Sequence, residues 1–91
     1  MKQKIAILGS TGSIGKSLLN IINRDKNNFQ IILLSANKNY KKLLHQAKLF
    51  DVKNLLISDK KIYLKLIKLK KYKKINFFNS YNDFYKIFKS K

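Results

Sequence analysis

Cysteine, proline, tryptophan and glutamate are all absent from this 91-residue chain, and only three glycines are present. Without cysteine the chain forms no disulfide framework and no thiolate metal site. No apolar run approaches the ~20 residues that a membrane-spanning helix requires. A candidate phosphate-binding loop begins at Gly9, within ten residues of Met1, which leaves no room for a signal or transit peptide. The sequence therefore predicts a soluble cytoplasmic chain that forms one small domain or part of one.

Negative charge is also scarce, since 4 aspartates stand against 21 lysines and arginines and give a net charge of +17. Basic surfaces bind nucleic acid through its phosphates. Here, however, the charge is lysine spread along the whole chain beside abundant asparagine and isoleucine, which is typical of compositional drift. Aromatic residues such as Tyr63, Tyr72 and Phe77 have spacings typical of core residues rather than of a base-stacking surface. The sequence argues against nucleic acid as the partner, and a small basic nucleic-acid-binding protein stays an alternative.

All three glycines lie in one short segment, which joins an apolar run to a helical pattern. Gly9, Gly12 and Gly15 follow the apolar residues 5–8 and precede Leu18, Leu19, Ile21 and Ile22. A buried strand that turns sharply into a helix points backbone N–H groups and the positive end of a helix dipole at one place. The segment therefore predicts a phosphate-binding loop.

The rest of the chain repeats this strand–helix pattern. The expected strands span residues 4–9, 29–36, 54–58 and 75–79, and the expected helices span 14–24, 40–50 and 59–71, with a last one after Ser80. Crossovers of this length favour a parallel sheet. We expect an α/β, Rossmann-like fold of four βα units, which form half of a doubly wound sheet in the order 4-3-2-1. In that order the first strand is an exposed apolar edge.

Each expected helix has an apolar stripe that we predict to be buried. The residues of these stripes are Ile14, Leu18, Ile21 and Ile22 in the first helix, Leu43, Leu44, Ala47 and Phe50 in the second, Ile62, Leu66 and Leu69 in the third, and Phe84, Ile87 and Phe88 in the fourth. Asp59 and Ser80 are the expected N-caps of the third and fourth helices.

Three interpretations of the glycine segment compete. Gly15-Lys16-Ser17 matches the end of a nucleoside triphosphate P-loop, but five residues rather than four separate Gly9 from Gly15. Residues 55–59 resemble a strand that ends in a magnesium-binding aspartate, as that interpretation requires. In a dinucleotide-binding fold, Gly9 permits the turn, Gly12 lets the backbone approach a pyrophosphate, and Gly15 lets the helix pack closely. A turn of purely structural function is the third interpretation.

The end of the second expected strand favours the dinucleotide fold and indicates which dinucleotide binds. NAD sites place an acidic residue there to bind the ribose 2′-hydroxyl. This chain instead has Asn37, Lys38 and Asn39, a cation and two amides that suit a 2′-phosphate. The predicted cofactor is therefore NADPH rather than NADH.

Residues 4–15, with the string Gly-Ser-Thr-Gly-Ser-Ile-Gly, resemble the N-terminus of the 1-deoxy-D-xylulose 5-phosphate reductoisomerase family, and residues 36–39 resemble its second NADPH segment. Aspartate-semialdehyde dehydrogenase-like enzymes have a similar opening, but residues 10–14 favour the reductoisomerases. Many members have glycine where this chain has Asn37, which tolerates left-handed backbone angles. The resemblance implies that Thr11, Gly12, Ser13 and Ile14 contact the cofactor near its pyrophosphate, and that Asn37, Lys38 and Asn39 surround the adenosine 2′-phosphate.

The resemblance also implies an NADPH-dependent oxidoreductase of isoprenoid biosynthesis by the non-mevalonate pathway. Such enzymes rearrange and reduce a sugar phosphate to 2-C-methyl-D-erythritol 4-phosphate, use a divalent metal (Mg or Mn), and are typically homodimers. We expect residues 1–91 to be the N-terminal part of the NADPH-binding domain, inactive alone, without the catalytic and C-terminal domains. No catalytic residue and no metal ligand is predicted in the chain: His45 has no expected partner, and the four aspartates are scattered.

Overall fold

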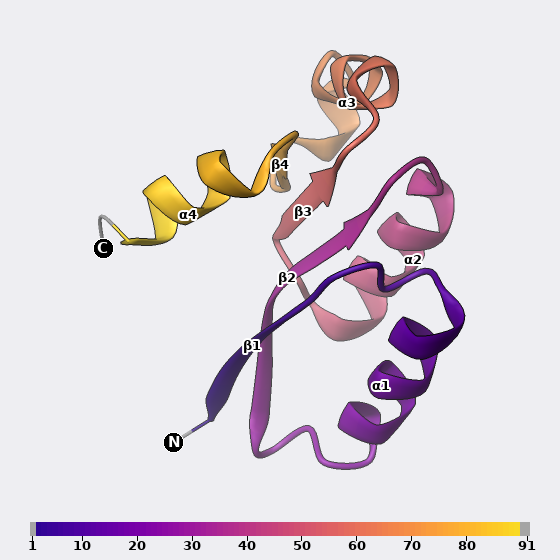
Figure 1. The fold of residues 1–91 in the computed structure, drawn as a ribbon, viewed down its shortest axis with the longest axis vertical. Coiled ribbons are helices and arrows are strands. Elements are labelled where there is room, and N and C mark those ends of the chain that lie inside the picture. The colour runs from indigo at the N-terminus through magenta and orange to yellow at the C-terminus, as the bar shows by residue number, and fades with distance from the viewer. Residues whose placement is uncertain (1, 90–91) are drawn as a thin grey trace.

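The computed structural model describes residues 2–89, and the side chains of residues 2–86. Four parallel strands form one sheet in the order β1-β2-β3-β4 (Figure 1). They are β1 (Gln3–Ile7), β2 (Phe29–Ala36), β3 (Asn54–Ile57) and β4 (Asn76–Phe78). The predicted α/β class and strand order are confirmed, and β1 is an edge strand.

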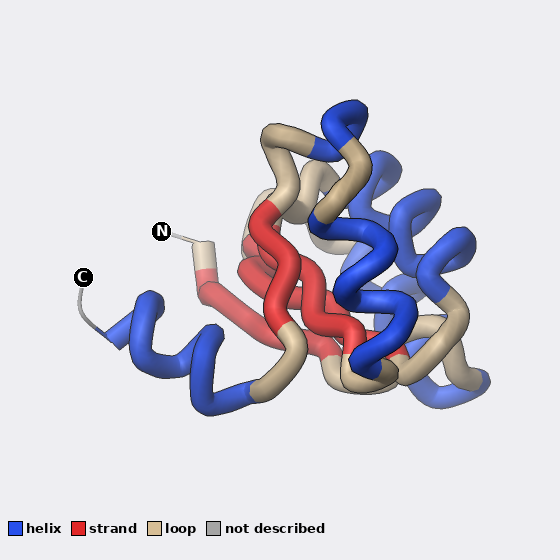
Figure 2. The backbone as a smooth tube through the Cα atoms, turned by 90° about the horizontal axis from the view of Figure 1, so that it is seen from above, coloured by secondary structure: helices blue, strands red, loops and turns tan. Residues whose placement is uncertain are grey.

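The helices form two layers on the sheet. Figure 2 shows α1 (Ser13–Asn23), α2 (Tyr40–Phe50) and α3 (Lys60–Ile67) on one side and α4 (Tyr81–Lys89) on the other. Asp59 caps α3, where its carboxylate accepts a hydrogen bond from the N–H of Ile62 at 3.1 Å. The Ser80 hydroxyl accepts from the N–H of Asp83 at 3.3 Å. Both predicted N-caps are confirmed.

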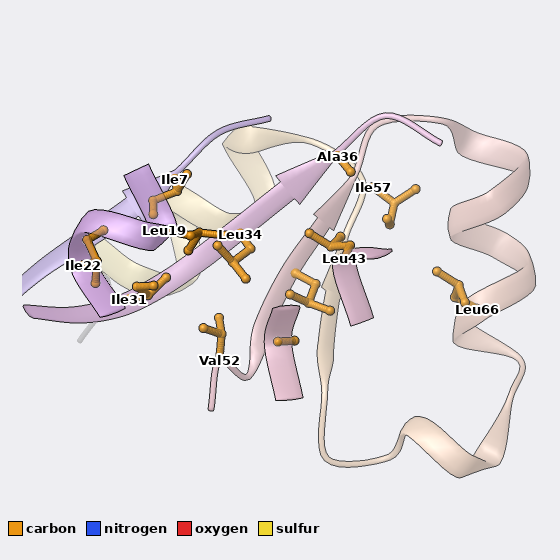
Figure 3. Close-up of a cluster of buried hydrophobic side chains, with 12 residues drawn as sticks. Ile7, Leu19, Ile22, Ile31, Leu34, Ala36, Leu43, Val52, Ile57 and Leu66 are labelled. Carbon is orange, nitrogen blue, oxygen red and sulfur yellow. The ribbon is translucent and has the colours of Figure 1, made fainter. Parts of the chain in front are cut away.

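Successive side chains of each strand point to opposite faces of the sheet, so the core is divided between the two helix layers. Leu34 of β2 pairs with Leu55 of β3, which pairs with Phe77 of β4, and this row faces α1, α2 and α3. The neighbouring residues Leu33, Leu56 and Phe78 face the other way and pack with Phe84 of α4. Figure 3 shows the larger cluster, which joins strand residues to Leu19, Leu43 and Leu66 of the three helices.

The buried stripe of α1 differs from the predicted one. Gly15, Leu19 and Ile22 are buried, whereas Ile14 is 80% exposed and Ile21 is 61% exposed, and Leu18 is also exposed. Only Ile22 was predicted correctly. The true stripe has the same helical period but is shifted by one residue, about 100° around the helix. Gly15 determines the shift, because the side without a side chain is the side that approaches the loop after β1.

The other predicted stripes are largely correct. In α2, Leu43 and Ala47 are buried, and Leu44 and Phe50 pack against the core. In α3, Leu66 is buried and Ile62 packs beside it, but Leu69 is exposed. The helix predicted to reach residue 71 ends at Ile67, and a short 3₁₀ helix (Lys70–Tyr72) follows, which lets Tyr72 and Ile75 turn back onto the core. Phe84 packs as predicted, and the side chains of Ile87 and Phe88 lie outside the described residues.

Aromatic residues considered for base stacking belong to the core instead. Tyr63, Tyr72 and Phe77 pack against the larger cluster, and the rings of Tyr72 and Phe77 meet edge to face with centroids 6.1 Å apart. The prediction that they are core residues is confirmed. None of the helices in the described part of the chain has the length and apolar character that crossing a bilayer requires.

Candidate cofactor-binding site

The glycine loop turns the chain from β1 into α1. Gly9 has a φ of +66°, a left-handed conformation that glycine adopts without strain. The N–H of Gly12 donates to the Gly9 carbonyl at 3.0 Å, and the N–H of Lys16 donates to the Gly12 carbonyl at 2.9 Å, so Gly12 is the N-cap of α1. The loop therefore delivers the start of α1 to the carboxyl end of β1.

Gly15 allows the first turn of α1 to contact this loop directly. A Cβ atom at Gly15 would lie 2.5 Å from the Gly9 carbonyl oxygen and 2.5 Å from the Cα of Ser10. Real Cβ atoms essentially never approach backbone so closely, so only glycine fits. This is the close helix–strand packing that the third glycine of a dinucleotide fingerprint provides.

Buried polar groups hold the loop from behind. The N–H of Gly9 donates to the hydroxyl of Ser35 at 2.9 Å, and the N–H of Ser10 donates to the Ser35 carbonyl at 2.9 Å. The Ser10 hydroxyl donates to the Gln46 side-chain oxygen at 2.7 Å, and the Gln46 amide donates to the Ser10 carbonyl at 2.9 Å. Ser10, Ser35 and Gln46 are all buried. They fix the loop to β2 and α2 and leave its outer surface open.

A third anchor comes from the opposite layer. The hydroxyl of Tyr81, the first residue of α4, lies 3.2 Å from the Ser35 hydroxyl. Sequence reasoning missed these anchor residues. The signal that could have found Ser35 and Gln46 is a polar residue within an apolar strand or on the buried stripe of a helix, because buried polar groups need hydrogen-bond partners.

The second predicted segment lies directly after β2. Asn37, Lys38 and Asn39 are all exposed. The Asn39 side chain caps α2 and accepts from the N–H of Lys42 at 3.4 Å, while the Asn37 side chain accepts from the Ser58 hydroxyl at 2.8 Å. Among residues 2–89, Asp51 is the only non-glycine residue with positive φ, so Asn37 does not use the left-handed conformation it tolerates.

Lys38 reaches toward the neighbouring strand–helix unit. Its ammonium lies 3.9 Å from the carboxylate of Asp59, and its side chain is 71% exposed. Asp59 also caps α3 and so is a structural residue of that helix. An exposed ion pair of this length is weak, so an anionic ligand can compete with Asp59 for the lysine.

The two predicted segments meet at one edge of the sheet. The strands β1 and β2 are parallel neighbours, and Ile7 at the end of β1 pairs with Leu34 near the end of β2. Thr11 is half-buried, and Gly12, Ser13 and Ile14 are exposed beside it. Figure 1 shows the β1–α1 and β2–α2 connections at the same side of the sheet. The geometry fits a dinucleotide with its pyrophosphate at α1 and its adenosine ribose at the end of β2.

No metal centre is apparent in the described part of the chain, where no group of three or more histidine, aspartate or glutamate side chains converges. Asp59 serves as a helix cap, and the four aspartates lie on separate elements. His45 is an exposed residue of α2. These residues do not fit the divalent metal that the family resemblance implies, so we assign it no ligand here.

Comparison with known proteins agrees with this geometry. Residues 5–90 match the family model of 1-deoxy-D-xylulose 5-phosphate reductoisomerase. The chain belongs to this family. It is 53% identical to the reductoisomerase of Pelagibacter ubique over 88 residues, which are 97% of this chain and 23% of that protein. A reductoisomerase of Wolbachia pipientis wMel is 42% identical over 64 residues, 70% of this chain and 16% of that protein.

A solved structure extends the similarity to three dimensions. The reductoisomerase of Zymomonas mobilis, in complex with NADPH, aligns with a TM-score of 0.74 and 34% identity over 85% of this chain and 20% of that one. The predicted family and Rossmann-like fold are thus confirmed. The chain spans about a fifth of the length of the relatives that it matches.

Proposed function

We propose that this chain forms the NADPH-binding part of a 1-deoxy-D-xylulose 5-phosphate reductoisomerase. The observation that carries the proposal is the close packing of Gly15 on the glycine loop, next to a strand, β2, that is followed by Lys38 rather than by an acid. The NADPH bound to the structurally similar Zymomonas enzyme supports it.

The backbone around Thr11, Gly12, Ser13 and Ile14 binds the pyrophosphate in this proposal. The first N–H groups of a helix have no acceptor within the helix, and the helix dipole favours negative charge there. Because the anchors of the loop lie behind it, these donors are already oriented before the ligand arrives. Preorganisation of this kind reduces the entropy that binding costs.

The second segment provides specificity for the 2′-phosphate. Lys38 supplies a cation, and Asn37 and Asn39 supply amide donors at the end of β2. No acidic residue directly follows β2 in the sequence to bind the 2′-hydroxyl of NADH, and the carboxylate beside Lys38, that of Asp59, caps α3. We therefore expect NADPH to bind more tightly than NADH.

The reaction of the family is the wider context of this site. Bound NADPH supplies a hydride for the reduction that gives 2-C-methyl-D-erythritol 4-phosphate in isoprenoid biosynthesis. The sugar-phosphate substrate, the divalent metal, a homodimer partner and a cytoplasmic location are further parts of this proposal. Our assignment to residues 2–89 is restricted to cofactor binding.

Binding measurements with NADPH, NADH and Mg-ATP test the proposal. The wild-type chain and the Lys38→Ala variant are titrated by nucleotide fluorescence or thermal shift. NADPH is expected to bind most tightly, and Lys38→Ala is expected to remove most of its advantage over NADH. Lys53→Ala is the matched control, because Lys53 is an exposed lysine at the amino end of β3, the opposite edge of the sheet.

Each other outcome has a distinct meaning. Tighter binding of Mg-ATP than of either dinucleotide would restore the P-loop interpretation and overturn the proposal. Equal binding of NADPH and NADH by the wild type would refute the assignment of residues 37–39. Equal losses in Lys38→Ala and Lys53→Ala would show that net charge rather than position determines binding.

A further inference from the structure

A basic groove runs between α1 and α2 on the outer face of these helices. It has a volume of about 340 Å³, and its lining includes Lys16 and Asn20 of α1, Lys42 and His45 of α2, and Lys26. None of the four aspartates of the chain is among its lining residues in the described structure. The groove is therefore a local concentration of positive charge without a protein counter-ion.

Lys16 and Lys42 line this groove from opposite helices, α1 and α2. The interaction with the Lys16 side chain, together with some desolvation and the charge of Lys16, lowers the pKa of Lys42 below its usual range. Two lysines so close disfavour each other's charged form. An anion placed between them would remove this repulsion and gain two charge-assisted hydrogen bonds.

The charged neighbour of Lys38, which precedes α2, differs from that of Lys42. It has an acidic neighbour, Asp59, at 3.9 Å, and its side chain is directed toward the start of α3. Lys42 has a second cation as its neighbour instead. The first turns of α1 and α2 therefore present two cations whose charge Asp59 does not compensate.

The position of this pair relates it to the cofactor. Lys16 follows Gly15 directly, within the first turn of α1 after the glycine loop. The backbone N–H of Lys42 is bonded to the side chain of Asn39, so Lys42 lies in the first turn of α2. The pair thus lies in the first turns of the two helices that follow the segments that the proposed function assigns to the dinucleotide.

We propose that Lys16 and Lys42 together bind the 2′-phosphate of NADPH and add to the preference for NADPH over NADH. This inference rests on the proposed function and extends it to two residues outside the segments 11–14 and 37–39. The pyrophosphate lies at the backbone N–H groups of the loop, and the only further phosphate of the cofactor is the one on the adenosine ribose.

The experiment compares how loss of each lysine changes the affinity for ligands with and without the 2′-phosphate. Lys16→Gln, Lys42→Gln and the double variant are compared with the wild type and with the control Lys53→Gln. The probes are NADPH, NADH, adenosine 2′,5′-bisphosphate, adenosine 5′-monophosphate and inorganic phosphate. The double variant is expected to lose at least about tenfold in affinity for NADPH and for the bisphosphate, and to bind NADH and the monophosphate within about twofold of wild type.

Thermal unfolding of each variant verifies that the fold is retained. Glutamine keeps a polar side chain at the exposed position 16 and the half-buried position 42 and removes a repulsion, so the melting temperature is not expected to fall. Inorganic phosphate is expected to bind weakly compared with the bisphosphate, because the adenosine positions the phosphate between the lysines.

Several results would overturn the inference. Equal losses of NADPH and NADH affinity would indicate general electrostatic attraction or a contact with the pyrophosphate. Unchanged affinities in the double variant, with Lys38→Ala still removing the NADPH preference, would reject this pair while leaving the proposed function intact. A wild-type chain that binds neither dinucleotide would refute the proposed function, and this inference with it.

Discussion

Ser10 and Gln46 exchange two hydrogen bonds that join the glycine loop to α2, one of 2.7 Å between their side chains and one of 2.9 Å to the Ser10 carbonyl. Both residues are buried, and they are 36 positions apart in the chain. The conformation of the loop is thus determined by residues of the second βα unit as well as by its own glycines. This coupling brings the two predicted cofactor segments into one unit.

The variant Gln46→Leu should therefore destabilise the whole fold. Leucine fills a similar space but leaves the buried carbonyl of Ser10 without the amide donor, and such a loss costs about 1–3 kcal/mol. Urea denaturation measures the change in the free energy of unfolding. Gln30→Leu is the control, since Gln30 is an exposed residue of β2. Similar losses in both variants would show that the Ser10–Gln46 pair contributes little.

A methyl group at Gly15 should destabilise the fold more than a methyl group at Gly12. In Gly15→Ala the Cβ meets backbone atoms at 2.5 Å, so α1 must move away from the loop, at a cost of about 1–3 kcal/mol or more. In Gly12→Ala the nearest atom is the Gly9 carbonyl oxygen at 3.4 Å, an ordinary contact. Urea denaturation should show a clear loss for the first variant and a much smaller one for the second. Equal losses would contradict the close packing of Gly15.

The fold was largely predictable because each strand is an apolar run separated from the next by a helix of suitable length. The bounds of β2 and α2 agree residue for residue with the prediction. The stripe of α1 was not predictable from hydrophobicity alone, because Ile14, Leu18 and Ile21 form as regular a series as Gly15, Leu19 and Ile22. Glycine carries no hydrophobic signal, although its lack of a side chain decides which side of this helix is buried.

Substitutions on the two sides of α1 should separate these stripes. Leu19→Ala removes a side chain that is 3% exposed and is expected to cost about 2–5 kcal/mol. Ile21→Ala removes one that is 61% exposed and is expected to change the free energy of unfolding by less than about 0.5 kcal/mol. Chemical denaturation of both variants decides the matter. A larger loss in Ile21→Ala would restore the stripe predicted from the sequence.

The candidate site was predictable in its outer layer only. The glycine loop and residues 37–39 have local patterns that indicate phosphate binding. Ser35 and Gln46, which hold the loop, and Tyr81, which contacts Ser35, come from three different elements, and only the folded chain brings them together. A local pattern contains no information on such contacts, whose sequence separations range from 25 to 46 positions.

Asp59 both caps α3 and pairs with Lys38, and two substitutions can separate these roles. Asp59→Asn retains the cap, because asparagine caps helices about as well as aspartate, whereas Asp59→Ala loses it at a cost of about 1 kcal/mol. Both variants free the Lys38 ammonium from its carboxylate neighbour. We expect both to raise the affinity ratio of NADPH to NADH by about 1.5- to 5-fold, the range for an exposed charge pair.

Nucleotide titration and urea denaturation of the two variants give separate measures of these roles. Only Asp59→Ala should lower the free energy of unfolding appreciably, while both should favour NADPH. A lower NADPH preference in Asp59→Asn, with stability retained, would show that the carboxylate positions Lys38 for the 2′-phosphate rather than competing with it. In that case the ion pair belongs to the site itself, and its removal weakens binding because the lysine loses its orientation.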